Sequence, residues 1–189
     1  MKKILFQLIA GCFMASIFSS CNLFGLDLQK DFEYEYSPVE LTMDMSAYAF
    51  IESRKNMDMS LLYDAITLAG YQQEYEIDDR TFIILNDVAF TSYLKDNRYS
   101  GLQAMKVEDI KTLLNSYIVK GRYHSLDLTT TPVKVETMNP DAIMYLSLRP
   151  QNNDAQNKFE VRINDVVNSG KVVSVVTSNL QPTNGIMHV

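Results

Sequence analysis

The sequence has few of the residues from which catalytic sites are built. It contains only two histidines, His124 and His188, and neither has a second histidine at the spacing of a metal site. Its seven glycines form no Gly-x-Ser-x-Gly turn and no glycine-rich phosphate loop. The sequence therefore lacks the usual signatures of metal-dependent, serine-nucleophile and nucleotide-dependent enzymes. We expect a protein that is not an enzyme and that holds no metal and no cofactor.

Positive charge is also scarce. Lysine and arginine number 17 against 23 acidic residues, which gives a formal net charge of −6. Nucleic-acid binding requires a basic face that neutralises phosphates, so this balance excludes nucleic acid as a partner. The 189 residues, of which 47% are hydrophobic and 11% aromatic, suit one globular domain with additional segments.

The N-terminus has the features of an export signal. Lys2 and Lys3 precede an apolar run over residues 4–18, which is too short for a membrane-spanning helix. The following Phe18-Ser-Ser-Cys21 resembles the cleavage box of bacterial lipoproteins, in which the cysteine becomes the lipidated N-terminus. The resemblance implies a signal peptide over residues 1–20 and a membrane anchor on Cys21. It places the protein in the bacterial envelope, in the outer membrane, on either the periplasmic or the surface face. Ordinary secretion is the alternative.

The only two cysteines both lie in this region. Cys12 falls within the segment that is removed, and Cys21 would carry the lipid. No thiol is then left for a disulfide, a zinc site or nucleophilic catalysis. The exported domain therefore depends on its hydrophobic core alone.

Residues 21–45 are expected to form a tether that leads from the anchor into the domain. Within it, Asp31-Phe-Glu-Tyr-Glu-Tyr36 alternates acidic and aromatic residues, as in an edge strand or an extended linker. A tyrosine-rich binding strip and an acidic sorting signal are the alternatives for this segment.

The central stretch of the sequence is Thr81-Phe-Ile-Ile-Leu-Asn-Asp-Val-Ala-Phe90. Its first five residues are β-branched or apolar and carry no charge, which predicts a strand covered on both faces. Asn86 is suited to cap a helix, and Asp87 adds negative charge at the positive end of the helix dipole. We expect a buried strand that turns sharply into a helix, with Phe90 returning to the core.

Helical spacing dominates the segments around this stretch. Ser46 is suited to start one helix, Asp58 or Ser60 the next, and Gly70 to end it. The strongest amphipathic pattern predicts a helix over 107–120 that ends at Gly121. Later segments are rich in Val, Ile and Thr, which predicts strands at 129–135, 143–148, 159–163, 172–177 and 186–189. Before the last strand, Asn184-Gly185 predicts a tight reversal with positive φ.

Two of these stretches resemble the signatures of the fasciclin domain family. They are Thr81 to Phe90 and Asn184-Gly-Ile-Met-His-Val189, in the family's order. The resemblance covers residues 46–189 and implies an α+β fold, a β-sandwich-like wedge with several packed helices. Ser116-Tyr117 replaces a Tyr-His pair that has been linked to adhesion in animal members, so that mode of adhesion is not carried over. The signature positions are Thr81, Phe82, Asn86, Asp87, Phe90, Asn184, Gly185 and His188.

These features indicate a lipid-anchored binding or adhesion module that recognises a protein or a glycan. Rigid tyrosine rings provide large contact area at small entropic cost. One alternative is a polysaccharide-processing hydrolase, which requires two carboxylates in a cleft. Another is an accessory subunit of an outer-membrane complex that adds a strand at an exposed edge near Val189. The tyrosines expected to contact the partner are Tyr34, Tyr36, Tyr93, Tyr99 and Tyr123.

Overall fold

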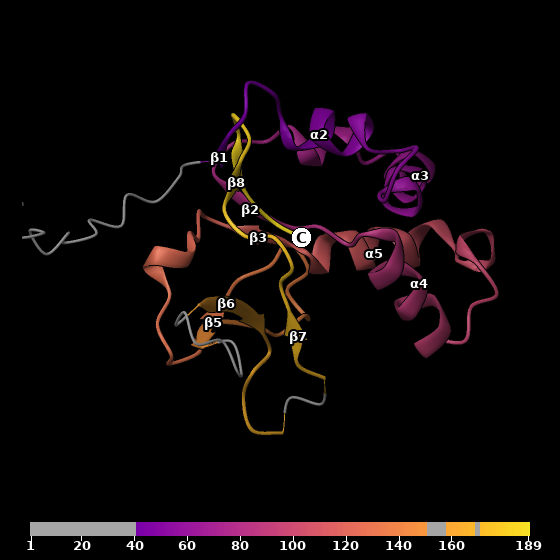
Figure 1. Cartoon of the computed structure of the whole chain (residues 1–189). Coiled ribbons are helices and arrows are strands. Elements are labelled where there is room, and N and C mark those ends of the chain that lie inside the picture. Colours follow the sequence, from indigo (N-terminus) through magenta and orange to yellow (C-terminus); the bar gives the residue numbers. More distant parts are fainter. Residues whose placement is uncertain (1–40, 151–157, 169–170) are drawn as a thin grey trace, which may run out of the picture. The chain divides into compact units, whose positions relative to one another are not determined.

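The computed structural model describes residues 41–150, 158–168 and 171–189. The lipidation candidate Cys21 and the tyrosines Tyr34 and Tyr36 lie outside these residues. The described part of the chain combines helices with two β-sheets and is an α+β fold, as expected (Figure 1). Within that part, no helix is both long enough and apolar enough to cross a membrane.

Most helices of the described part of the chain precede most of its strands. The first half contains α2 (Ala47–Ser53), α3 (Ser60–Ala69), β2 (Arg80–Ile83), α4 (Asp87–Asp96) and α5 (Val107–Ser116), after the short strand β1 (Leu41–Thr42). The second half contains β3 (Ile118–Lys120), β4 (Val133–Val135), β5 (Met144–Pro150), β6 (Phe159–Ile163), β7 (Val173–Ser174), β8 (Leu180–Gln181) and β9 (Gly185–His188). Three short 3₁₀ turns are η1 (Gln72–Tyr75), η2 (Leu102–Ala104) and η3 (Ser125–Asp127).

Sheet A brings the two signature stretches together. Its strand order is β1-β8-β9-β2-β3, and β2 pairs in parallel with β9 and antiparallel with β3. Thr81 lies directly opposite Ile186 in this ladder. All four residues of β2 are buried. Thr81, Phe82 and Ile83 belong to the uncharged run that predicted this burial, whereas the charged Arg80 precedes that run. The strand β1 pairs with β8, so the segment before residue 46 contributes to the sheet.

Strand β2 is buried because a separate core lies on each of its faces. Successive side chains of a strand point to opposite faces. Phe82 and Ile84 therefore pack with the helices, whereas Ile83 packs with sheet B. Figure 1 shows the helices on one side of sheet A and the strands β5 and β6 on the other. Fully burying each such side chain stabilises the fold by about 1.5–3 kcal/mol before entropy is considered.

The helix ends follow the sequence signals. The side chain of Ser46 accepts a hydrogen bond from Ala49 N at 3.1 Å at the start of α2. The side chain of Asn86 accepts from Ala89 N at 2.9 Å at the start of α4. Gly70 ends α3 in the left-handed conformation, with φ of 64°. These three predictions are confirmed.

The predicted helix over 107–120 is wrong in its last part. Helix α5 ends at Ser116, and Ile118 begins β3. Ile118 and Val119 are β-branched and pair with Phe82 and Thr81 of β2, so pairing in the sheet outweighs the helical spacing. Gly121 has a φ of 86° but follows a strand and not a helix.

The end of the chain differs from two predictions. The predicted tight reversal is confirmed, because the turn at Thr183 and Asn184 joins the antiparallel strands β8 and β9 and Gly185 N donates to Pro182 O at 3.3 Å. Its predicted positive φ is wrong, since neither Asn184 nor Gly185 has one and Gly185 is the first residue of β9. Strand β9 lies between β8 and β2, and Val189 N donates to Thr177 O at 2.8 Å. Val189 O accepts from Val176 N at 2.7 Å. In the part of the chain that the structure describes, Val189 is therefore paired through its backbone, and the exposed edge expected there for strand addition by an accessory subunit is not found.

Candidate binding surface

Sheet B has one apolar and one polar face. Its strands follow the order β4-β5-β6-β7, and every neighbouring pair is antiparallel. Leu146, Val161 and Ile163 point into the core shared with sheet A. Because side chains alternate, the residues between them point the other way. We call this second face the outer face of sheet B; it carries Lys134, Tyr145, Ser147, Arg149, Glu160, Arg162 and Ser174.

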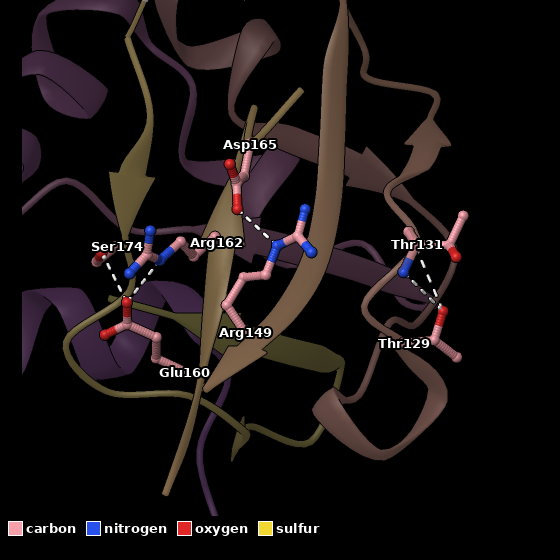
Figure 2. Close-up of polar contacts among 7 residues, drawn as sticks. All are labelled: Thr129, Thr131, Arg149, Glu160, Arg162, Asp165 and Ser174. Carbon is pink, nitrogen blue, oxygen red and sulfur yellow. Dashed lines mark hydrogen bonds and ion pairs between the residues drawn. The ribbon is translucent and has the colours of Figure 1, made fainter. Parts of the chain in front are cut away.

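One ion pair on the outer face depends on a turn after β6. Asn164 has a φ of 58°, and its side chain accepts from Tyr145 N at 2.9 Å. Asparagine tolerates this left-handed conformation better than most residues. Asp165 follows and binds Arg149 through Oδ2 and Nε at 2.6 Å (Figure 2). The turn thus fixes the direction of the Arg149 side chain.

A second polar group lies beside the first. Arg162 Nε donates to Glu160 Oε1 at 2.6 Å, and Ser174 Oγ donates to the same oxygen at 3.1 Å (Figure 2). Glu160 and Arg162 are two residues apart on β6, and Ser174 lies opposite Arg162 on β7. Ion pairs that remain partly exposed contribute only about 0–1 kcal/mol to stability. The main effect of both groups is to orient the guanidinium groups.

The hydroxyl of Ser147 lies beside both arginines. Ser147 pairs with Arg162 across the ladder, and Arg149 follows two residues later on the same face. Ser147 is 1% exposed, and among the described residues nothing hydrogen-bonds its Oγ. A buried hydroxyl without a partner costs about 1–3 kcal/mol. Among the described residues, no hydrogen bond thus offsets the burial of this hydroxyl.

A short turn adjoins β5 at the other side of this surface. Thr129 Oγ1 accepts from Thr131 N at 3.2 Å, and both residues are exposed (Figure 2). Thr129 O accepts from Leu148 N at 2.8 Å, which attaches the turn to β5. The surface is thus bordered by hydroxyl and backbone polar groups.

The signature residues, by contrast, build the frame of the domain. Thr81, Phe82, Phe90, Asn184, Gly185 and His188 are buried. Thr81 Oγ1 donates to Gly121 O and accepts from Tyr123 N, each at 2.8 Å. Asp87 accepts from Leu61 N at 2.9 Å and from Ser60 Oγ at 2.8 Å, so it joins α3 to α4. Sequence reasoning placed Asp87 at the helix dipole but missed this link.

The three described tyrosines from the expected contact set are half-buried. Tyr93 and Tyr99 pack against the helical core, and Tyr123 packs against the core between the sheets. Burial raises the pKa of Tyr93 above its ordinary value. Their contact with a partner stays a prediction, and none of them lies on the outer face of sheet B.

Sequence reasoning singled out none of the residues on that outer face. The signal was present as polar residues at every second position, 145, 147 and 149 in β5 and 160 and 162 in β6. Such alternation predicts a strand with one solvated face. The segments were instead recognised only as rich in strand-forming residues.

A shallow hollow of about 470 Å³ lies over α4, lined by Asp87, Val88, Thr91, Ser92 and Lys95. Asp87 is its only carboxylate and is already bound to α3. The hollow therefore lacks the pair of carboxylates that the hydrolase alternative requires. The described residues also contain no group of three or more His, Cys, Asp or Glu side chains that could hold a metal ion.

His188 is a buried structural residue, as predicted. It is fully buried, and its Nε2 lies 2.9 Å from Tyr123 O. Because a carbonyl only accepts, Nε2 carries the proton, and Nδ1 has no hydrogen-bond partner in the described part of the chain. Burial lowers the pKa of His188, and nearby His124 lowers it further, although the bond to Tyr123 O acts in the opposite direction.

This geometry predicts a loss of stability in acid. The unfolded chain binds a proton at His188 near the ordinary pKa of about 6.5, whereas the folded domain does so only at lower pH. The contribution of neutral His188 to the free energy of unfolding is fully present above about pH 6.5. It falls as the pH drops toward the lowered pKa, by at most about 1.4 kcal/mol per pH unit. His188→Gln keeps a donor for Tyr123 O but does not titrate. Urea unfolding between pH 8 and pH 5 should show a shallower slope for this variant.

The half-exposed His124 provides the matched control. Its Nδ1 accepts from Leu126 N at 3.2 Å at the start of η3. His124→Gln should leave most of the pH slope in place. Equal slopes for the unchanged protein and His188→Gln would contradict the assignment to His188.

Comparisons with known proteins indicate the family to which this chain belongs. The fasciclin domain model matches residues 57–189. A search of curated proteins found no match. Among solved structures, a FAS1 domain pair from the insect cell adhesion molecule fasciclin I is similar, with a TM-score of 0.45 and 18% identity. That alignment covers 76% of this chain and 43% of the other, so this chain spans less than half the length of that protein. The family match extends over most of the sequence and includes both signature stretches; the chain belongs to the fasciclin domain family.

Proposed function

We propose that this fasciclin domain is a lipid-anchored binding or adhesion module of the bacterial cell envelope, that it holds a protein or glycan, and that it catalyses no reaction. The observation that carries the proposal is the outer face of sheet B. Arg149 and Arg162 are each paired with a carboxylate on a face that packs against neither core. Membership of the fasciclin family supports a binding or adhesion role.

The sequence around Cys21 supports the anchor. A bacterial host that expresses the full-length chain should incorporate labelled palmitate into it and place it in the detergent phase. Cys21→Ser should abolish both results, whereas Cys12→Ser should leave both intact, because Cys12 lies in the signal peptide. Multiple acyl chains on one cysteine would hold the protein firmly. Label and detergent partitioning that persist in Cys21→Ser would overturn the lipid anchor.

The binding role has a separate test. The full-length Cys21→Ser chain should bind a fraction of envelope protein or envelope glycan saturably. Protease treatment of intact cells that carry the unchanged protein would then distinguish the surface face from the periplasmic face. A soluble chain that binds no fraction would contradict the binding role while leaving the anchor unaffected.

A further inference from the structure

The two arginines of the outer face are each held through the nitrogen Nε. Arg149 and Arg162 each use Nε for a bond of 2.6 Å to a carboxylate. Their terminal nitrogens have no hydrogen-bond partner among the described residues. Their side chains are 33% and 24% exposed, so solvent reaches both. A guanidinium that is fixed in this way presents two parallel donors, which match the two oxygens of an oxyanion.

The two guanidinium groups belong to one site because of the sheet register. Arg162 lies opposite Ser147, and Arg149 is two residues beyond Ser147 on β5. Such diagonal neighbours lie about 7–8 Å apart, within reach of one extended ligand. Ser147 Oγ, which has no partner in the described part of the chain, lies at the base between them.

The acceptors beside the arginines restrict the kind of ligand. Asp165 and Glu160 carry negative charge next to the two guanidinium groups, and Ser174 adds a hydroxyl. An acidic peptide brings carboxylates for the guanidinium groups but few hydroxyl donors for these acceptors. A sugar acid brings a carboxylate for the guanidinium groups and hydroxyl donors for the carboxylates.

We propose that the outer face of sheet B binds an acidic glycan, a sugar chain that carries carboxylate groups, with Arg149 and Arg162 as its anchors. The inference rests on the proposed binding function and narrows the partner to one chemical class. The ligand's carboxylate bonds the terminal nitrogens of the arginines, and a ring hydroxyl donates to Asp165. Preorganisation by these two acids lowers the entropic cost of binding.

Calorimetry with the full-length Cys21→Ser chain tests the inference. Polygalacturonate, which carries a carboxylate on each sugar, should bind saturably and more weakly as salt rises. The fully methyl-esterified polymer has the same backbone without the charge and should bind at least tenfold more weakly. Arg149→Gln and Arg162→Gln should each lower the affinity for polygalacturonate about tenfold, because each removes a charged pair of hydrogen bonds.

Arg54→Gln is the matched control. Arg54 also binds a carboxylate, Asp58, through Nε at 2.8 Å, but it follows helix α2 and not sheet B. This variant should bind like the unchanged chain. Arg149→Lys and Arg162→Lys keep the charge and lose the paired donors, so they should also bind more weakly with unchanged melting temperatures.

Three results would overturn the inference. They are equal affinity for the methyl-esterified polymer, unchanged affinity in both arginine variants, and binding of polyglutamate in place of polygalacturonate. A chain that binds an envelope fraction but not polygalacturonate would overturn the glycan inference and leave the proposed function standing. A chain that binds neither would overturn both.

Discussion

Gly185→Ala is expected to destabilise the domain by roughly 3 kcal/mol, because a methyl group at this position overlaps the backbone of the neighbouring strand. A Cβ on Gly185 would lie 2.3 Å from Arg80 O and 3.0 Å from Phe82 Cε2. The carbonyl belongs to β2, which pairs in parallel with β9 at this point. Relief of the overlap therefore requires the two central strands of sheet A to separate. Urea unfolding of the full-length Cys21→Ser chain measures the effect.

Gly101→Ala is the control for this substitution. Nothing lies within 4 Å of a Cβ built on Gly101, and its φ of 171° is extended backbone that any residue adopts. The midpoint of unfolding should stay within the usual range of surface substitutions, about 0.5 kcal/mol. A Gly185→Ala chain with the same midpoint as the Gly101→Ala chain would show that β2 and β9 are not packed as described.

The parts of the fold that sequence predicted well are those with a local physical cause. The uncharged run from Thr81 predicted a strand between two layers, because only such a strand can lack polar side chains on both faces. Ser46, Asn86 and Gly70 act on the backbone of their own helix ends, and all three have the predicted roles. The family resemblance then placed the two signatures in one domain, and they pair directly.

The parts that sequence missed depend on distant segments. Ile118 continues a helical pattern, yet it joins a strand because β2 offers a free edge opposite Phe82. Asn184 and Gly185 lie at the predicted tight reversal, but without the expected positive φ, and both also make contacts with segments about 100 residues earlier in the chain. No local sequence pattern indicates a contact between segments so far apart in the chain. Prediction therefore failed where tertiary pairing outweighed local preference.

The candidate site was missed for a related reason. Signature residues draw attention in the sequence, but in this domain the described ones build the cores and the strand pairing. The outer face of sheet B arises only when β5, β6 and β7 lie side by side, since Arg149, Arg162 and Ser174 come from three strands. The turn at Asn164 brings Asp165 to Arg149, and the spacing of these residues in the sequence does not indicate that contact. A binding surface can thus lie apart from the signatures that identify the family.

Asn184 connects three separate segments through its side chain. Its Oδ1 accepts from Ala47 N at 2.9 Å, which satisfies a free N–H at the start of α2. Its Nδ2 donates to Tyr75 O at 2.9 Å and to Ile77 O at 3.3 Å. The residue is 3% exposed, so water cannot replace these bonds without a structural change.

Asn184→Ala should therefore destabilise the domain by about 3 kcal/mol, since it leaves a buried N–H and a buried carbonyl unpaired at about 1–3 kcal/mol each. Asn184→Asp keeps the acceptor for Ala47 N but loses both donated bonds, so it should also destabilise at neutral pH. Asn97→Ala is the control, because its single side-chain bond to Tyr93 O is exposed and should matter little. Urea unfolding measures all three variants. A loss at Asn184→Ala no larger than at Asn97→Ala would show that Asn184 does not hold α2 and η1 against the end of the chain.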